Sequence, residues 1–488
     1  MHILRPSGAR PGFYSALTLC LFMAFAARLL VAIVWPQPWR PDEIFQYMEP
    51  AHKLAFGTGI TTWEWHAGIR SWLVPGIIAQ LMKIGAACGI TQQLLFIRVC
   101  TAFFSLPVVI AFFWYGWRNG GSAMAWTLGV SAAFWPDILS GGIRTLGEFL
   151  AGNVLCVGVI CLVAYRQEST TRTCFFLAAV SGFCLSLAAA IRFQIAPASA
   201  LAFLFLLQKG KIKPFFIGCL AALIPVTALG LTDYLTLEQA FQSVFRNYHY
   251  NQTLGVANSF GKKWPGYYVQ KYALLWGALF PALIFFCIKS GKERRIPLLV
   301  AIFIVFYHSL IPHKEVSFVY SAVPLLVFCA ACGCYTHIIA RLSHAAMPVA
   351  GLSLLLLFAF YSSYTPYLSR GNYGISFELQ ATHRHDICGI GLLTDPQADT
   401  YREIGAGYSG LTKHIPLYLL TSPEEVKTTQ QHYNYLITST YGESGSPGAD
   451  WQQIKCKEDS VCLYHRPSGC DGAPDFEQFS QKLHTLSK

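Results

Sequence analysis

Residues 13–35 read FYSALTLCLFMAFAARLLVAIVW, a predominantly apolar run. A helix needs about 20 such residues to cross the hydrocarbon core of a bilayer. Arg5 and Arg10 precede the run, and it continues too far to be the apolar part of a cleavable signal. We therefore expect the first membrane-spanning helix here, with the N-terminus of the chain on the cytoplasmic side.

The composition of the whole chain agrees with this class of protein. Of its 488 residues, 54% are hydrophobic and only 12% are charged, about half the charged fraction of an ordinary soluble protein. The net charge of +11 comes from short cationic clusters between apolar runs, a pattern typical of cytoplasmic loops. Such a distribution argues against a nucleic-acid-binding surface.

Further apolar runs follow the first and define the expected architecture. They lie at 71–89, 99–117, 121–139, 146–165, 173–191, 193–208, 214–231, 272–288, 296–312, 318–340 and 345–365. The cationic clusters allow the stretch 71–117 to cross only once, so run 71–89, with Pro75, Gly76 and Lys83, is not expected to span. We expect an all-α polytopic membrane protein with about 11–12 transmembrane helices.

The domain organisation follows from the same topology. Residues 1–365 form the multi-span domain, with long outer loops at 36–70 and 232–271. Residues 366–488 mix apolar, polar and turn residues and are expected to form a small α+β soluble domain, also on the outer face.

Cysteines in this tail bear on its redox environment. Four of them, Cys388, Cys456, Cys462 and Cys470, lie in the extracytoplasmic tail. Four cysteines allow three disulfide pairings, and the short spacing favours Cys456 with Cys462.

The first outer loop carries the strongest chemical signal. It contains Asp42-Glu43, then Phe56-Gly57-Thr58-Gly59, then Thr62-Trp63-Glu64-Trp65 and Ile69-Arg70-Ser71. Adjacent carboxylates beyond a membrane helix suit a catalytic site at the interface. The structural alternative is that tryptophans anchor the interface and that the acids start a helix whose first residue is Pro41.

In this order the motifs closely resemble the first outer loop of glycosyltransferase family 22, the mannosyltransferases of the N-glycan and GPI-anchor pathways. That family typically has His-Pro-Asp-Glu or His-Gln-Asp-Glu there, and Arg40 stands in place of the histidine. Later segments resemble the family in the same order: Arg144-Thr145-Leu146, Arg192, Asp233 to Tyr268 in the second outer loop, and His313-Lys314-Glu315-Val316-Ser317-Phe318. The resemblance covers roughly residues 40–325.

The resemblance implies a fold of the GT-C type and an enzyme that transfers mannose from a polyprenyl- or dolichyl-phosphate sugar to a glycan or glycolipid, with inversion. Asp42 is then the general base, and Glu43 orients the acceptor. The implied donor-phosphate residues are His313, Lys314, Arg192 and Arg144. The implied substrate-binding residues are Glu64, Trp63, Arg70 and Asn251.

Other interpretations remain open from the sequence. Arg192 interrupts an apolar stretch, as in a functional site or a tight outer hairpin, and His313-Lys314 also fits a short interfacial loop with snorkelling cations. Asn251-Gln252-Thr253 is a glycosylation sequon. The alternative function is a transporter or flippase of lipid-linked glycans. Nothing indicates a structural metal or nucleotide site, so the expected partners are the lipid-phosphate sugar, its acceptor and the lipids of the bacterial inner membrane or the ER membrane.

Overall fold

The computed structural model describes residues 12–35, 40–369, 373–394, 414–441, 445–457 and 461–486. The chain forms two compact units, one of residues up to 32 with 99–366 and one of 33–98 with 367–488. The first outer loop and the tail, which are far apart in the sequence, therefore fold into the same unit. Arg5 and Arg10 lie outside the described residues.

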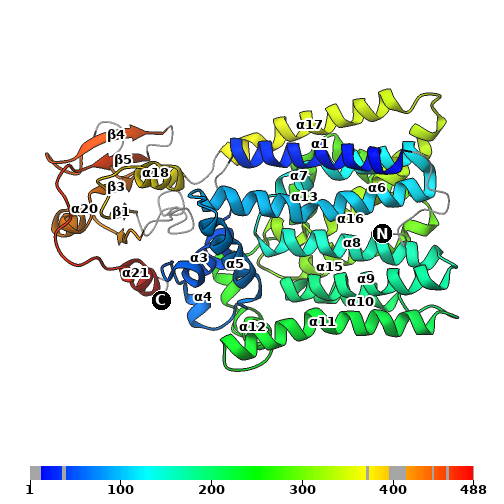
Figure 1. Cartoon of the computed structure of the whole chain (residues 1–488), viewed down its shortest axis with the longest axis horizontal. Coiled ribbons are helices and arrows are strands. Elements are labelled where there is room, and N and C mark those ends of the chain that lie inside the picture. The colour runs from blue at the N-terminus through cyan, green and yellow to red at the C-terminus, as the bar shows by residue number, and fades with distance from the viewer. Residues whose placement is uncertain are drawn as a thin grey trace. The chain divides into compact units, whose positions relative to one another are not determined.

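Long apolar helices build the first unit. They are α1 (Phe13–Val34), α6 (Gln93–Phe134), α8 (Gly147–Gln167), α9 (Thr171–Ile191), α11 (Ile212–Thr236), α16 (Ala322–His337) and α17 (Ala346–Ser369). Figure 1 shows α8, α9 and α11 lying side by side. In the most apolar window of α8, 78% of residues are buried, against 17% in α17. Because a helix that is apolar all round suits either a bundle interior or a membrane span, the burial decides, and it makes α8 central and α17 peripheral.

Among the described residues, seven helices are long and apolar enough to cross a membrane, or eight if α13 (Tyr267–Trp276) and α14 (Leu279–Ile288), bent by 112°, count as one span. The expected polytopic all-α membrane fold is confirmed. The number differs from the expected 11–12 because α6 contains two apolar runs, joined at Gly121. In addition, α10 (Ala196–Leu204) and α15 (Arg295–Leu310) have only 9 and 16 residues.

Shorter helices connect these elements and carry much of the candidate site. In the first outer loop and just after it lie α2 (Pro41–Glu43), α3 (Glu49–Phe56), α4 (Trp63–His66) and α5 (Leu73–Ala87). The connections of the bundle include α7 (Pro136–Gly141) and α12 (Gln242–Tyr248). Helix α5 has 15 residues and is too short to qualify as a span, in agreement with the expectation for run 71–89.

The tail is a small α+β domain, as expected. Its sheet has the order β2-β1-β3-β5-β4, and its strands are β1 (Ile390–Leu393), β2 (Leu417–Leu420), β3 (Tyr435–Thr438), β4 (Gln452–Cys456) and β5 (Cys462–His465). Strand β1 pairs in parallel with β2 and β3, and β5 pairs antiparallel with β3 and β4. All residues of β1, β2 and β3 are buried, as continuous apolar strands covered on both faces should be. The helices of the domain are α18 (Tyr373–Thr382), α20 (Pro423–Thr429) and α21 (Gln478–Leu486).

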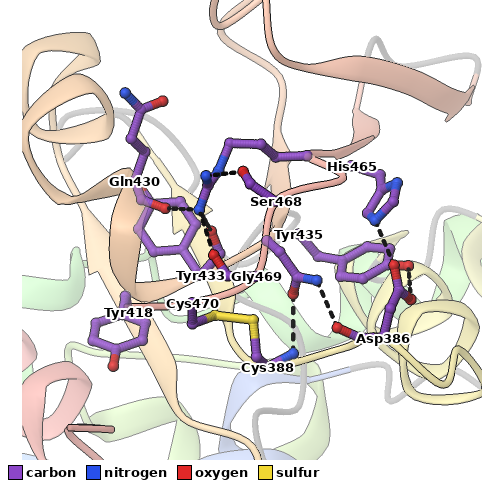
Figure 2. Close-up of a disulfide and its surroundings, with 12 residues drawn as sticks. Asp386, Cys388, Tyr418, Gln430, Tyr433, Tyr435, His465, Ser468, Gly469 and Cys470 are labelled. Atoms are coloured by element: carbon purple, nitrogen blue, oxygen red, sulfur yellow. Dashed lines mark hydrogen bonds and ion pairs between the residues drawn. A yellow bond between two sulfur atoms is a disulfide. The ribbon is translucent and has the colours of Figure 1, made fainter. Parts of the chain in front are cut away.

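Two disulfides close the tail. Cys456 is bonded to Cys462, as predicted, across the paired strands β4 and β5, and Cys388 is bonded to Cys470. Figure 2 shows the second disulfide near Asp386, whose carboxylate accepts a hydrogen bond from the Tyr435 hydroxyl at 2.9 Å. The second bond ties the chain before β1 to the segment after β5, so it encloses most of the sheet.

Removing the two disulfides should have unequal effects on the stability of the tail. The Cys388–Cys470 bond closes a loop of 82 residues and the Cys456–Cys462 bond one of 6. The chain-entropy argument assigns about 4–5 kcal/mol to the long loop and about 2 kcal/mol to the short one. We expect Cys388→Ala/Cys470→Ala to lower the urea midpoint for tail unfolding, measured by pulse proteolysis of the full chain, more than Cys456→Ala/Cys462→Ala does. Equal losses would contradict the argument.

Candidate active site

The acidic pair lies at the start of a continuous helical segment in the first outer loop. Helix α2 begins at Pro41, whose missing N–H is not needed there. The segment widens into a π-helix over Ile44–Met48 and continues as α3. Pro50 supplies a physical reason, because it has no N–H to donate and its ring clashes with the carbonyl four residues earlier. Asp42 is half-buried and Glu43 is 2% exposed.

The Phe56-Gly57-Thr58-Gly59 motif serves to turn the chain. Gly57 ends α3 in the left-handed region, with φ of 82°, and its N–H donates to the Lys53 carbonyl. A Cβ on Gly59 would lie 2.6 Å from the Glu49 carbonyl oxygen, so only glycine permits this close approach. The Glu49 carboxylate then accepts the Ile60 N–H at 3.1 Å. This motif therefore shapes the loop rather than supplying reactive groups.

Glu64 and Arg70, both predicted as substrate-binding residues, lie together as an ion pair. The same Glu64 oxygen is 3.4 Å from the side-chain nitrogen of Gln46, one turn beyond the acidic pair. Trp65 makes a second contact with the same helical segment, since its indole N–H donates to the Phe45 carbonyl at 2.9 Å. These contacts join the second half of the loop to the acid-bearing helical segment. Gln46 was not predicted as a site residue, because nothing local in the sequence marks it as the partner of Glu64.

Trp63 is half-buried at the start of α4. Asn251 lies in the second outer loop, within the first unit, where its side-chain amide donates to the Asn247 side chain at 2.9 Å and to the Asn247 carbonyl at 3.2 Å. Its contacts with Asn247 are therefore local to its own loop. Its role in substrate binding stays a prediction.

Lys314 lies between α15 and α16, in the first unit, and is 4% exposed. Its ammonium donates to the carbonyl of Lys263, at 3.1 Å, and to the carbonyl of Ile311. Carbonyls solvate a cation but do not neutralise it, and a buried charge is costly unless paired. In the part of the chain that the structure describes, no carboxylate forms an ion pair with Lys314. The arrangement is that of a buried cation able to receive an anion.

His313 lies beside this lysine and contacts the second outer loop. Its Nδ1 is 2.9 Å from the Gly261 carbonyl and its Nε2 is 3.6 Å from the Glu315 carboxylate. Figure 1 places the loop's α12 at one end of α11, and the Lys263 N–H donates to the Pro312 carbonyl. The His-Lys-Glu motif is thus packed against the second outer loop through backbone carbonyls on both sides.

Arg192 follows the last residue of α9 and forms an ion pair with Glu148 in the first turn of α8, with an N–O distance of 2.5 Å. Both side chains are buried, at 7% and 3% exposed. Arg144 precedes α8 and is 1% exposed. The sequence marked both arginines, but it did not identify Glu148 as a partner. The only available signal was an acidic residue two positions after the Arg144-Thr145-Leu146 motif.

Breaking the Arg192–Glu148 pair should be strongly destabilising. Removal of one member of a buried ion pair typically costs about 3–5 kcal/mol, because the other charge is left behind in the interior. We expect Glu148→Leu to lower the thermal stability of the detergent-purified chain sharply. The double variant Glu148→Leu/Arg192→Leu should cost less than the sum of the single variants. Additive losses in this double-mutant cycle would show that the pair is not energetically coupled.

Two further buried charges support the connections of the bundle and were missed in the sequence. Arg28, fully buried in α1, donates to the Ser105 hydroxyl at 2.9 Å and to the Ala133 carbonyl at 3.3 Å. Asp137 in α7 accepts the indole N–H groups of Trp135 and Trp276 at 3.0 and 2.7 Å. Burial raises the pKa of Asp137 to about 6. These contacts fix the connection between α6 and α8, in which Arg144 lies.

A profile of the Alg9-like mannosyltransferase family matches residues 19–384. The chain belongs to this family. The resemblance to glycosyltransferase family 22 is thereby confirmed.

Similar proteins include GPI mannosyltransferase 3 of Yarrowia lipolytica, 25% identical over 65% of this chain and 62% of that protein. GPI mannosyltransferase 3 of Drosophila melanogaster is 32% identical over 30% and 26%, respectively. GPI alpha-1,2-mannosyltransferase 3 of Homo sapiens is 25% identical over 63% and 56%. The chain thus spans at most about six-tenths of the length of these three relatives.

Solved structures show the same fold. ArnT from Cupriavidus metallidurans bound to undecaprenyl phosphate aligns over 94% of this chain and 98% of its own, with a TM-score of 0.58 at 11% identity. The apo form aligns with a TM-score of 0.56 at 12% identity, over 92% and 97%. The expected GT-C fold of this Alg9-like family member is therefore confirmed.

Proposed function

We propose that this chain is a mannosyltransferase that moves a mannosyl group from a polyprenyl- or dolichyl-phosphate donor to a mannose-containing glycolipid or glycan on the outer face of the membrane. Membership of the Alg9-like mannosyltransferase family supports the reaction class. The single observation that carries the donor assignment is Lys314, a buried ammonium held by two carbonyls and without an ion-pair partner among the described residues. A phosphate supplies the missing negative charge.

The reaction needs a base and a stabilised leaving group. The acceptor hydroxyl oxygen attacks the anomeric carbon of the donor, the bond from that carbon to the phosphate oxygen breaks, and the hydroxyl proton passes to the Asp42 carboxylate. Negative charge develops on the departing lipid phosphate, where a fixed cation stabilises the transition state. In this proposal Lys314 and His313 contact the phosphate, helped by Arg192 or Arg144. One in-line displacement inverts the anomeric configuration.

The acceptor is proposed from the relatives. Several carry the name GPI mannosyltransferase 3, and the human relative is named as an alpha-1,2-mannosyltransferase. An α-linked product formed by inversion requires a β-linked donor. In this proposal Glu43 orients the acceptor, and the substrate-binding residues are Trp63, Glu64, Arg70 and Asn251.

Transfer by the purified full-length chain in lipid nanodiscs tests the proposal. A radiolabelled polyprenyl-phosphate mannose is offered with mannose-terminated glycolipids or with lipids that lack mannose. We expect label on the mannose-terminated acceptor alone, with release of the polyprenyl phosphate. Absence of transfer, together with protein-dependent scrambling of a fluorescent lipid-linked glycan in proteoliposomes, would favour the transporter or flippase instead.

A further inference from the structure

The C-terminal helix α21 presents two contact faces that point in roughly opposite directions. Successive residues of a helix are about 100° apart, so Gln478 and Lys482 share one side while Ser480 and His484 share the other. The helix is started by Asp475, whose carboxylate accepts the N–H groups of Glu477 and Gln478 at 2.9 and 3.0 Å. Glu477 immediately precedes α21 and lies on the same side as Ser480.

One face of α21 is bonded to the tail sheet. The Gln478 side chain accepts the Leu419 N–H at 2.8 Å and donates to the Leu419 carbonyl at 3.0 Å. Because β2 is an edge strand, this amide satisfies groups that a neighbouring strand would otherwise bind. Lys482 forms an ion pair with Glu425 in the first turn of α20. This face makes α21 a fixed part of the tail.

The opposite face of α21 is bonded to the first outer loop. The Ser480 hydroxyl accepts the N–H of Thr61 at 3.0 Å, and Ser480 is only 4% exposed. Water therefore has little access to replace this bond, and losing it leaves a buried donor unsatisfied. Glu477 lies 3.4 Å from the Lys53 ammonium, and the rings of His484 and His66 meet edge to face at 5.0 Å. Figure 1 shows α21 beside α3 and α4.

The residues that α21 holds are connected to the acid-bearing helical segment. The Thr61 hydroxyl accepts from Lys53 of α3 at 3.0 Å. The chain then continues through Trp65, which bonds to the carbonyl of Phe45, three residues after Asp42. These contacts link Thr61 to the helical segment that carries the two carboxylates.

We propose that α21 is a strap that positions the first outer loop, so that the C-terminus of the chain sets the placement of Asp42 and Glu43. Ser480, Glu477 and His484 are its positioning residues, and none of them touches substrate. The catalytic consequence rests on the proposed function, whereas the attachment of the loop does not.

Matched substitutions on adjacent residues test the strap in the full-length chain. Ser480→Arg places a large cation against Thr61, whereas Gln481→Arg makes the same charge change at an exposed position of the same helix. We expect Ser480→Arg to speed amide hydrogen exchange in residues 57–66 and to lower kcat by about 10- to 100-fold, since small misplacements of catalytic groups have effects of that size. The KM for the lipid-phosphate donor should stay unchanged. Gln481→Arg should leave exchange and kcat within about twofold of the parent, and Ser480→Thr, which keeps the hydroxyl acceptor, should resemble the parent.

Reversing the charges of the Lys53–Glu477 pair provides a second test if Ser480→Arg does not fold. Lys53→Glu and Glu477→Lys should each speed exchange in the loop, and the combined variant should restore protection by re-forming the pair with reversed signs. If none of these variants changes amide hydrogen exchange in the loop, the inference that α21 holds the loop is wrong. If exchange becomes faster while kcat is unaltered, the inference that α21 positions the carboxylates is wrong. If the parent chain transfers no mannose while exchange responds as expected, the proposed function fails and the attachment stands.

Discussion

Asp42→Asn is expected to lower kcat by about 10²- to 10⁴-fold, the usual contribution of a positioned general base. The substitution removes the proton-accepting carboxylate and keeps the size and shape of the side chain. Asp42 is the second residue of α2, whose N-cap residue is Arg40. Because Asp42 lies within the first turn, losing its charge costs only about 0.3–1 kcal/mol of helix stabilisation, far less than the expected effect on catalysis. The loss should therefore appear in turnover and not in folding.

The measurement is initial-rate mannose transfer at saturating donor, together with binding of the polyprenyl phosphate product. Donor-side binding should be unchanged, because the carboxylate acts on the acceptor. Asp471→Asn is the matched control, since it makes the same chemical change at an exposed position of the tail. Near-normal activity of Asp42→Asn would remove Asp42 from the role of base.

The second large effect is expected at Lys314. Lys314→Met keeps the length of the side chain and removes a buried positive charge that, among the residues the structure describes, is held by neutral carbonyls. Truncating one side of a buried charge pair typically costs about 2–5 kcal/mol, so we expect kcat/KM for the donor to fall about 30- to 5,000-fold. Lys262→Met, at an exposed position of the second outer loop, is the matched control and should leave kcat/KM near the parent value.

Donor affinity should also depend on pH through this residue. Burial lowers the pKa of Lys314 below its ordinary value. The ammonium form binds the phosphate, so affinity is fully present below the lowered pKa and is lost as the pH rises through it. Titrating the binding of polyprenyl phosphate should show this alkaline loss in the parent and a flat response in Lys314→Met. A donor affinity that is equal in both proteins at neutral pH would place the phosphate elsewhere.

The first outer loop shows how far local sequence reasoning reaches. Pro41 at a helix start acts through near neighbours, so its position was readable from residue type. Gly57-Thr58-Gly59 was quoted only as a motif, and its close approach to the Glu49 carbonyl came from the structure. The sequence also pointed to Glu64 and Arg70. It could not show that each is the other's partner, because which side chains meet depends on how the loop folds back on itself.

By itself, the sequence determined the class of the molecule, the positions of its apolar helices, the order of the family motifs and the acidic pair. Those properties follow from the length of apolar runs and from residue types, which act over a few positions. Only the tertiary structure decided that Glu148 pairs with Arg192, that Lys314 is held by carbonyls of two loops, and that Ser480 holds Thr61 across 419 residues of sequence. Each of these pairings joins groups that a linear pattern does not relate, and each exists because packing excludes water and requires buried polar groups to find partners.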